Sequence, residues 1–303
     1  MLKTIYSKLD KRKVAGIATL LLTILVVEIV LTCIIPMWKQ YFFDVLNTKD
    51  SAEFPTALMY FFALMLSLGS VQGIKTWIGQ KLAFQIRIAG NKTLLKAWVY
   101  SPHTTKNYTQ PITESLHNWT NLSLVIFIEV LISASIIIGL VVANWNSPLI
   151  VLGALVYTII IMLIAIVFNK PLVNSNVHYQ STEGIYRESI SDIANGNGDY
   201  SSKSKFKEVA SAYTKYIRNL MYFTLFSKLK LSTASAIPFI LLAPAYFSGS
   251  MTLGDFMAGV STFELLVINS TILLAMYPEY TKMIASYNIS NSFYEKLDWE
   301  NTN

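Results

Sequence analysis

The sequence predicts an all-α polytopic membrane protein, and three observations support this fold class: its composition, its long apolar segments and the distribution of its positive charges. Hydrophobic residues make up 53% of the 303 residues and charged residues only 14%, whereas soluble domains average about 25% charged residues. A bilayer core about 30 Å thick requires about 20 apolar residues per helix. Six stretches meet that length, so we expect six transmembrane helices.

Each of the six stretches has the features of a membrane helix. None alternates strictly between polar and apolar residues, as strands of a membrane barrel do, and in lipid the backbone of such runs is satisfied within helices. The first stretch is too long for a signal-peptide core and lacks a small-residue cleavage site, so we expect it to be retained. The fifth contains Pro238 and Pro244, which predict a bend or a hinge. The six ranges are 14–36, 54–79, 122–145, 148–169, 222–248 and 254–278.

The connections between these stretches alternate in positive charge. The residues before the first stretch and the two longest connections are rich in Lys and Arg, and we count Lys75 and Lys81 in the connection after the second stretch. The turns near 144–148 and 249–254 contain neither Lys nor Arg. By the positive-inside rule, we expect a multi-pass protein of the bacterial inner membrane with both termini in the cytoplasm.

The two long connections mix apolar and cationic residues at helical spacing, as residues 80–101 show. We therefore expect helices two to five to extend beyond the membrane as two long hairpins. Pro102 and Pro111 predict the first tip near 101–113, and the run NGNGDYSS predicts the second at 195–204. The expected organisation is a cytoplasmic N-terminal segment at 1–13, a single six-helix transmembrane domain at 14–298 and a C-terminal tail at 299–303.

Three acidic residues lie inside apolar stretches, where ionisable side chains are costly and usually functional. They are Glu28 in the first stretch, Glu129 in the third and Glu264 in the sixth. Burial favours the neutral form of a carboxyl group, so a carboxyl that lines a cavity is able to bind and release a proton. The alternative is a structural hydrogen bond to a neighbouring helix, or a position near the membrane interface.

The sequence lacks the signatures of several other classes of protein. The net charge of +6 is better explained by cationic cytoplasmic loops than by nucleic-acid binding. The sequence has no Gly-rich phosphate loop, GxSxG elbow or HExxH pattern, so we predict neither an enzyme nor a cofactor. The three histidines are far apart in sequence and Cys33 is the single cysteine, so we expect no metal site and no disulfide within the chain.

Several short motifs follow one another along residues 38–298. MWKQYFFDVLNTKDSAEF follows the first stretch, and Arg87, Leu94 and Trp98 share one predicted helix. QPITE stands at 110–114 and QSTEGIYRESI at 180–190. Two further pieces, Ala243-Pro244 and Met251-Thr252-Leu253-Gly254, lie near the fifth and sixth stretches. Taken in this order, the motifs resemble the SbmA/BacA peptide-uptake family, whose membrane core is similar to an ABC exporter transmembrane domain.

The resemblance implies an ABC exporter-like (type IV) fold in a domain-swapped homodimer that imports peptides or other bulky solutes with the proton gradient and without an ATPase domain. It also implies roles for individual residues. Glu114, Glu183 and Glu188 match acidic positions of the family and become candidates for proton coupling, together with Glu28 and Glu264. Arg187 matches a basic position and is a candidate for a structural ion pair.

The chain also departs from the family pattern in its sixth stretch. Where the family has a glutamate, this chain has Asn269, and Glu264 lies just over one helical turn earlier. The acid pair at the first hairpin tip is reduced to Glu114 followed by Ser115. These departures weaken the expectation of proton coupling more than the expectation of the fold.

Three functions remain open from the sequence. The first is a homodimeric, proton-coupled importer, whose partners are a second copy of itself, a peptide or bulky solute, protons and membrane lipid. The second is the membrane subunit of an ABC transporter whose separate ATPase docks on the tips near 102–113 and 195–204. The third is an immunity or receptor protein that binds a toxic peptide without transporting it. The sequence predicts no nucleic-acid partner for any of them.

Overall fold

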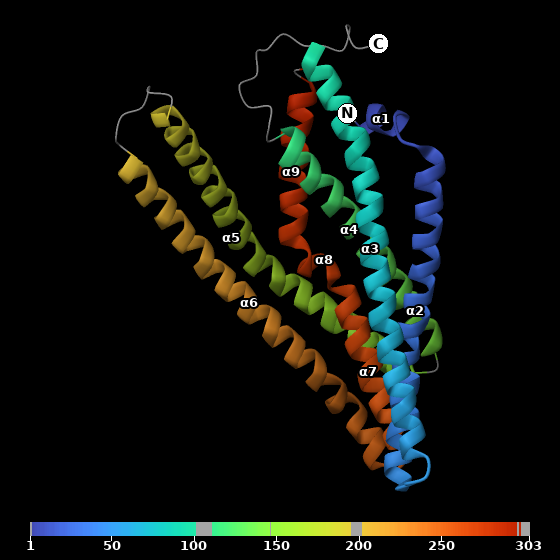
Figure 1. The fold of residues 1–303 in the computed structure, drawn as a ribbon. Coiled ribbons are helices and arrows are strands. Elements are labelled where there is room, and N and C mark those ends of the chain that lie inside the picture. Colours follow the sequence, from blue (N-terminus) through green and yellow to red (C-terminus); the bar gives the residue numbers. More distant parts are fainter. Residues whose placement is uncertain (1, 101–110, 146, 195–201, 296, 298–303) are drawn as a thin grey trace.

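The computed structural model describes residues 2–100, 111–145, 147–194, 202–295 and 297, and every regular element in these ranges is a helix (Figure 1). Both predicted hairpin tips lie largely outside the described residues, as does the C-terminal tail at 299–303. The helices are α1 Leu2–Ser7, α2 Lys11–Thr48, α3 Phe54–Tyr100, α4 Leu116–Ala143, α5 Pro148–Ala194, α6 Ser202–Phe247, α7 Leu253–Ser270, α8 Ile272–Ala275 and α9 Tyr277–Glu295. A π-helical turn, Pro111–Ser115, leads directly into α4.

The long hairpins expected from the sequence are present. α3 spans 47 residues and α5 another 47, and at about 1.5 Å per residue each is about 70 Å long, more than twice the thickness of a bilayer core. Within the described residues, five helices are long and apolar enough to cross a membrane. The protein is therefore an all-helical polytopic membrane protein, with α2, α3, α4, α5 and α6 as the candidate spans.

The sixth expected helix, 254–278, is interrupted twice in the structure. Thr271 Oγ1 donates a hydrogen bond of 2.8 Å to the Val267 carbonyl in the turn before it, and such back-bonding bends helices. Pro278 is the second residue of α9 and has no amide hydrogen to continue the ladder of α8. The segment therefore consists of α7, a single turn in α8, and α9.

The helices form a V with a narrow end and a wide end (Figure 1). We call α5 and α6 the arm, and the remaining helices the body. The arm packs against α7 at the narrow end, where its base belongs to the same core as the body. Toward the wide end the arm diverges from α3, α4 and α9, and α1 lies on the body side there.

Two hydrophobic cores stabilise the body. The larger lies toward the narrow end and combines α2, α3, α4 and α7 with the base of the arm, around Phe263, which is fully buried. The smaller lies at the wide end, where Ile5 of α1 packs with Leu94, Leu116 and Phe293 from α3, α4 and α9. The N-terminal segment is thus part of a packed core, and the far half of the arm belongs to neither core.

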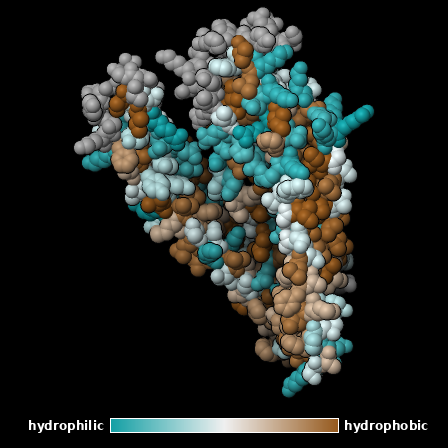
Figure 2. All heavy atoms as spheres, in the orientation of Figure 1, coloured by the Kyte–Doolittle hydropathy of each residue, from teal (hydrophilic) through white to brown (hydrophobic). Residues whose placement is uncertain are grey.

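The surface of the V differs between its two ends. Hydrophilic side chains gather at the wide end and around the gap between arm and body, while hydrophobic side chains dominate the lower part (Figure 2). Many large apolar residues of the arm are exposed, such as Leu163, Val167 and Ile240, which are 62%, 68% and 73% exposed. Apolar patches of this extent mark contact with lipid or with another protein.

Candidate functional site

Three charged side chains from three different helices meet inside the body. Lys75 of α3 donates hydrogen bonds to Glu28 Oε1 of α2 at 2.9 Å and to Glu129 Oε1 of α4 at 3.0 Å. The exposed fraction of the side chain is 6% for Glu28, 11% for Lys75 and 32% for Glu129. We call these three residues the Lys75 cluster. It is the most deeply buried group of charges among the described residues.

The surroundings of the Lys75 cluster are apolar. Leu25 lies one turn before Glu28 on α2, Ile78 one turn after Lys75 on α3, and Ile128 and Ile132 flank Glu129 on α4, and all four belong to the larger core. Glu28 and Lys75 therefore interrupt buried apolar stripes of their own helices, and Glu129 lies beside such a stripe on α4. α3 continues through Lys75, and the lysine side chain is almost fully covered.

The cluster contains two carboxylates but one ammonium group. With all three ionised its formal charge is −1, and Glu28 Oε2 is buried without a hydrogen-bond partner. A buried carboxylate oxygen without a partner loses the hydration that it had in water. The cluster is thus incompletely compensated in both charge and hydrogen bonding.

Glu264 of α7 has a different arrangement. Its carboxylate lies 3.9 Å from Lys39 Nζ of α2, and both side chains are just over a quarter exposed. This is a one-to-one pair without excess charge. Asn269, where the resemblance leads one to expect a glutamate, donates its side-chain amide to the Leu265 carbonyl of its own helix at 2.7 Å, and makes no hydrogen bond to another helix among those of the described residues.

The motif residues at the narrow end join α2 to α7. Asp44 accepts a hydrogen bond of 2.9 Å from the Gly254 amide, and Gln40 donates one of 2.7 Å to Asp255. Thr252 and Asp255 form a capping box at the start of α7, which satisfies amide groups that lack a helical partner. A Cβ atom at position 254 would overlap Gln40 and Asp44, which explains the glycine in the MTLG motif.

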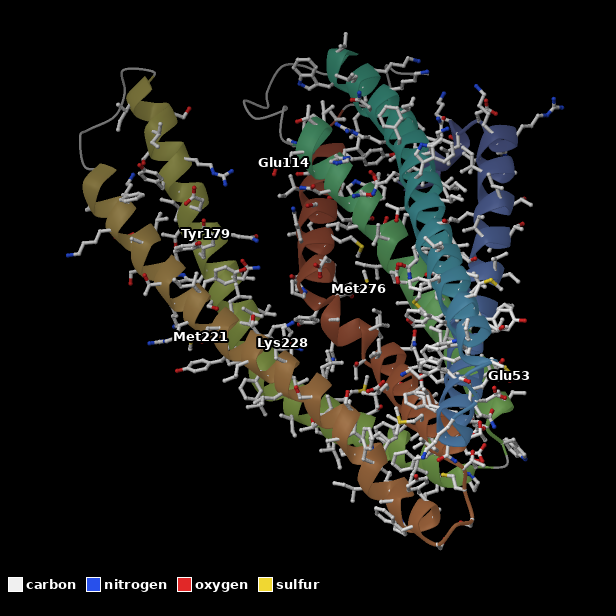
Figure 3. The ribbon with its side chains drawn as sticks, turned by 60° about the horizontal axis from the view of Figure 1, so that its bottom comes forward. Glu53, Glu114, Tyr179, Met221, Lys228 and Met276 are labelled. Carbon is white, nitrogen blue, oxygen red and sulfur yellow. The ribbon has the colours of Figure 1, made fainter. Side chains whose placement is uncertain are left out.

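The remaining candidate acids lie away from the Lys75 cluster. Glu183 lies on the far half of α5, 3.6 Å from Arg187 Nε on the same helix, and the arginine side chain is 68% exposed. Glu188 is on the same helix, and its side chain lies outside the described residues. Glu114 is exposed at the wide end, just before α4, and is far from Glu53 at the opposite end of the body (Figure 3). The structure does not bring these acids together with Glu28.

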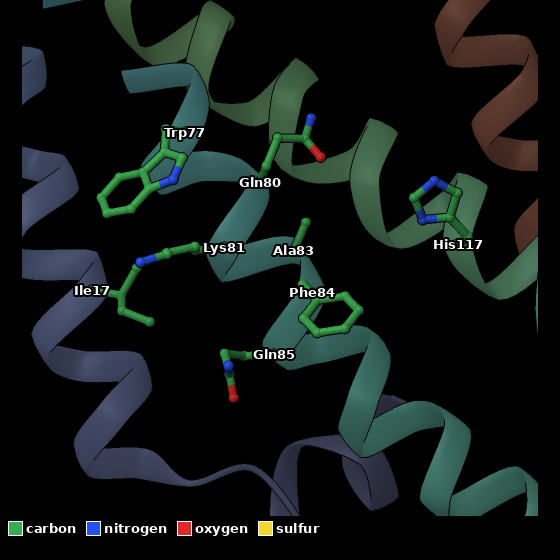
Figure 4. Close-up of a pocket in the computed structure, with 8 residues that line it drawn as sticks. All are labelled: Ile17, Trp77, Gln80, Lys81, Ala83, Phe84, Gln85 and His117. Atoms are coloured by element: carbon green, nitrogen blue, oxygen red, sulfur yellow. The ribbon is translucent and has the colours of Figure 1, made fainter. Parts of the chain in front are cut away.

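A groove of about 560 Å³ opens beside α3 on the wide-end side of the Lys75 cluster (Figure 4). Its lining combines apolar and polar side chains, and Lys81 Nζ lies 3.6 Å from the centre of the Trp77 ring. Trp77 follows Lys75 by two residues, so the groove begins about 3 Å further along the helix axis. The lining residues are Ile17, Trp77, Gln80, Lys81, Ala83, Phe84, Gln85 and His117.

Metal binding has no support in the described residues. No group of three or more His, Cys, Asp or Glu side chains lies close enough there to hold a metal ion. His117 and His178 are exposed on α4 and α5, and His103 lies outside the described residues. Cys33 packs close to Gly139 of α4 and is a free thiol.

Sequence reasoning found two of the three members of the Lys75 cluster and missed the third. Glu28 and Glu129 stand out because each interrupts an apolar run, whereas Lys75 lies near the end of its predicted stretch, 54–79, where a cation usually marks the membrane interface. The available signal was charge balance. Acids inside apolar stretches favour a nearby cation, and Lys75 lies within the range 54–79 of the second stretch.

Comparison with known proteins agrees with this architecture. Residues 1–197 match the family described as ABC transporter transmembrane region 2. A relative in Escherichia coli (strain K12), the inner membrane ABC transporter ATP-binding protein YddA, is 21% identical over 304 aligned residues. The alignment covers 88% of this chain and 54% of the relative, so the chain spans about half the length of that protein. With helices that fit a polytopic transporter and a family match over more than half of its length, the chain belongs to the ABC transporter transmembrane region 2 family.

Proposed function

We propose that two copies of this chain form a transporter of the bacterial inner membrane that imports peptides or other bulky solutes with the proton gradient. The observation that carries the proposal is the divergence of the arm from the body. The gap between them is bordered by hydrophilic side chains, whereas hydrophobic side chains dominate the lower part of the V (Figure 2). This distribution suits a polar path that is enclosed by helices and surrounded by lipid.

A second copy is part of the proposal because one V leaves its far arm without a packing partner. In the described residues, the far half of α5 and α6 contacts neither of the two cores. If the arm of each copy inserts between the body helices of the other copy, the far halves of both arms are covered. Such a reciprocal exchange is a low-cost route to a two-fold dimer, and it fits the domain-swapped homodimer and six-span topology that the resemblance implies, with α7 as the sixth span.

Protons are the proposed energy source, and Glu183 and Glu188 are the acids that the resemblance favours. Replacement of either by Gln removes the charge and nearly preserves the shape. We expect each variant to lose transport while the dimer still forms, which cross-linking in membranes would show. Full transport in both variants would exclude these two residues from the mechanism.

A second candidate is the membrane subunit of an ABC transporter with an ATPase on another chain. Two observations favour it: the chain belongs to an ABC transporter membrane family, and the E. coli relative, about twice as long as the matched region, is called an ATP-binding protein. In this case the inward transport of solute would depend on ATP and on the second chain.

Uptake of a fluorescent peptide into proteoliposomes separates the two candidates. We expect uptake under an imposed pH gradient without ATP, and its loss when a protonophore is added. Uptake that requires ATP and a co-reconstituted ATPase would instead support the second candidate. Peptide binding without any uptake under either condition would contradict both.

A further inference from the structure

We propose that the Lys75 cluster is a proton-binding site, in which one exchangeable proton resides on Oε2 of Glu28. The proposal deepens the proposed proton-driven transport and rests on it for its biological purpose. It assigns the proton to the membrane bundle, away from Glu183 and Glu188 on the arm. Its chemical basis is independent of the transported solute and follows from charges, contacts and burial.

The first step in the argument is charge balance. Lys75 compensates one carboxylate, and the second leaves the cluster with a formal charge of −1, in which Glu28 and Lys75 lie in the apolar core and the Glu129 side chain is 32% exposed. An isolated buried charge is strongly disfavoured unless it is paired or neutralised. No group of three or more His, Cys, Asp or Glu side chains in the described residues offers a metal site, and a proton is the smallest cation that removes the excess charge.

The second step assigns the proton to one oxygen. Lys75 occupies Oε1 of Glu28, whereas Oε2 of the same carboxyl group is buried and has no hydrogen-bond partner. Glu28 as a whole is 5% exposed, while the Glu129 side chain is 32% exposed and water can solvate its charge. Protonation at Glu28 Oε2 therefore leaves Lys75 and Glu129 as an ordinary pair of opposite charges.

The third step considers the other ionisable groups on the elements that pack around Glu28. On α7 the acids are Asp255 and Glu264, whose partners are Gln40 and Lys39 further along α2. On α2 itself, Cys33 faces Gly139 of α4. On α3 the next cation is Lys81, which lies over the Trp77 ring. In the described structure Lys75 is the cation that pairs with Glu28 and Glu129.

Proton binding changes how three helices are held together. A proton from hydronium forms an O–H bond at Glu28 Oε2, water is released, and no covalent bond of the protein breaks. Before this step Lys75 binds two carboxylates and links α2, α3 and α4. Afterwards its bond to α2 goes to a neutral acid and loses the Coulomb attraction between ammonium and carboxylate, which is stronger where water is excluded. The proton thus weakens the α2–α3 contact relative to the α3–α4 contact.

Infrared difference spectroscopy on the full chain in lipid tests this assignment without measuring transport. We expect the wild type to show one protonated-carboxyl C=O band that disappears on titration to alkaline pH and shifts in D₂O. Glu28→Gln should abolish the band. Lys75→Met leaves two acids without a cation and should about double the band area. Combining Lys75→Met with Glu129→Gln should restore a single band.

Glu264→Gln is the matched control, because it removes a half-buried acid from a balanced pair and should leave the band unchanged. If Glu28→Gln does not fold, Glu28→Asp should shift the band in frequency. The proposal is overturned if the wild type has no titrating band, or if the band survives in Glu28→Gln and is lost in Glu129→Gln. A titrating Glu28 in a protein that transports only with ATP would retain the proton site and reject the proposed energy source. Proton-driven uptake without a Glu28 band would retain the proposed energy source and reject the proton site at Glu28.

Discussion

The body and the arm hold their charged residues in opposite surroundings. In the body, Lys75 connects Glu28 and Glu129 from two other helices, 47 and 54 residues away in sequence, within an apolar core. In the arm, Arg187 and Glu183 lie one turn apart on a single helix, and the arginine is mostly exposed. The Lys75 cluster links three helices and so affects how they pack. The Arg187–Glu183 pair lies within one helix and adds little beyond the stability of that helix. Buried charges therefore report on tertiary structure in this protein, and exposed ones do not.

The largest expected effect is that of Lys75→Met, which removes the cation from the buried Glu28 and from the partly exposed Glu129. Breaking a buried ion pair by removing one partner typically costs about 3–5 kcal/mol, and we expect a loss of stability of that size in thermal unfolding of the detergent-solubilised protein. The triple variant with Glu28→Gln and Glu129→Gln should recover most of the loss, because no buried charge remains. A single variant as stable as the wild type would contradict the contrast between body and arm.

A smaller effect is expected at the junction of α2 with α7. Gly254→Ala places a Cβ against Gln40 and Asp44, and overpacking of this kind costs about 1–3 kcal/mol. Gly73→Ala is the control, since the space around its Cβ is open and alanine favours the helix by about 1 kcal/mol. We expect the two substitutions to shift the unfolding midpoint in opposite directions. Shifts in the same direction would show that close approach at Gly254 is unimportant.

Trp38→Phe tests a single polar contact between neighbouring helices of the body. The indole Nε1 of Trp38 donates a hydrogen bond of 3.0 Å to the Ala57 carbonyl, and its ring stacks on Phe42. The substitution keeps an aromatic ring and removes the donor, so we expect a loss of about 1 kcal/mol. Chemical unfolding would measure it, and a loss no larger than that of a surface substitution would show that lipid headgroups or water replace the bond.

The smallest effect is expected for Arg187→Gln in the arm. Exposed ion pairs one helical turn apart contribute about 0.3–0.5 kcal/mol, and we expect the unfolding midpoint to change by little. Peptide uptake measured on the same preparation separates stability from function. A large loss of stability would mean that Arg187 is buried by a partner subunit in the assembled protein, and the comparison would then apply only to the isolated chain.

The sequence was sufficient for the helical class and for the long hairpins, because apolar length and helical periodicity are local properties. The continuation of α3 to Tyr100 and of α5 to Ala194 follows from such patterns. The Lys75 cluster could be predicted only in part, because contacts between residues some 50 positions apart depend on how helices rotate against each other. The breaks in the sixth stretch were missed for a related reason. Pro278 stood at the predicted end, where a proline is unremarkable, and the hydrogen bond of Thr271 is visible only in three dimensions.

The junction between α2 and α7 has a consequence for how the chain is made. α7 carries Asp255, Glu264 and Asn269, and it is not among the helices that are apolar enough to cross a membrane unaided. Its acids and its first amide groups find partners on α2, through Gln40, Lys39 and Asp44. During synthesis α2 emerges some 200 residues earlier, so these partners are already in the bilayer when α7 leaves the ribosome. We expect α7 to enter the membrane after α2 and only with the help of these partners. Truncation of α2 should therefore prevent the membrane insertion of α7.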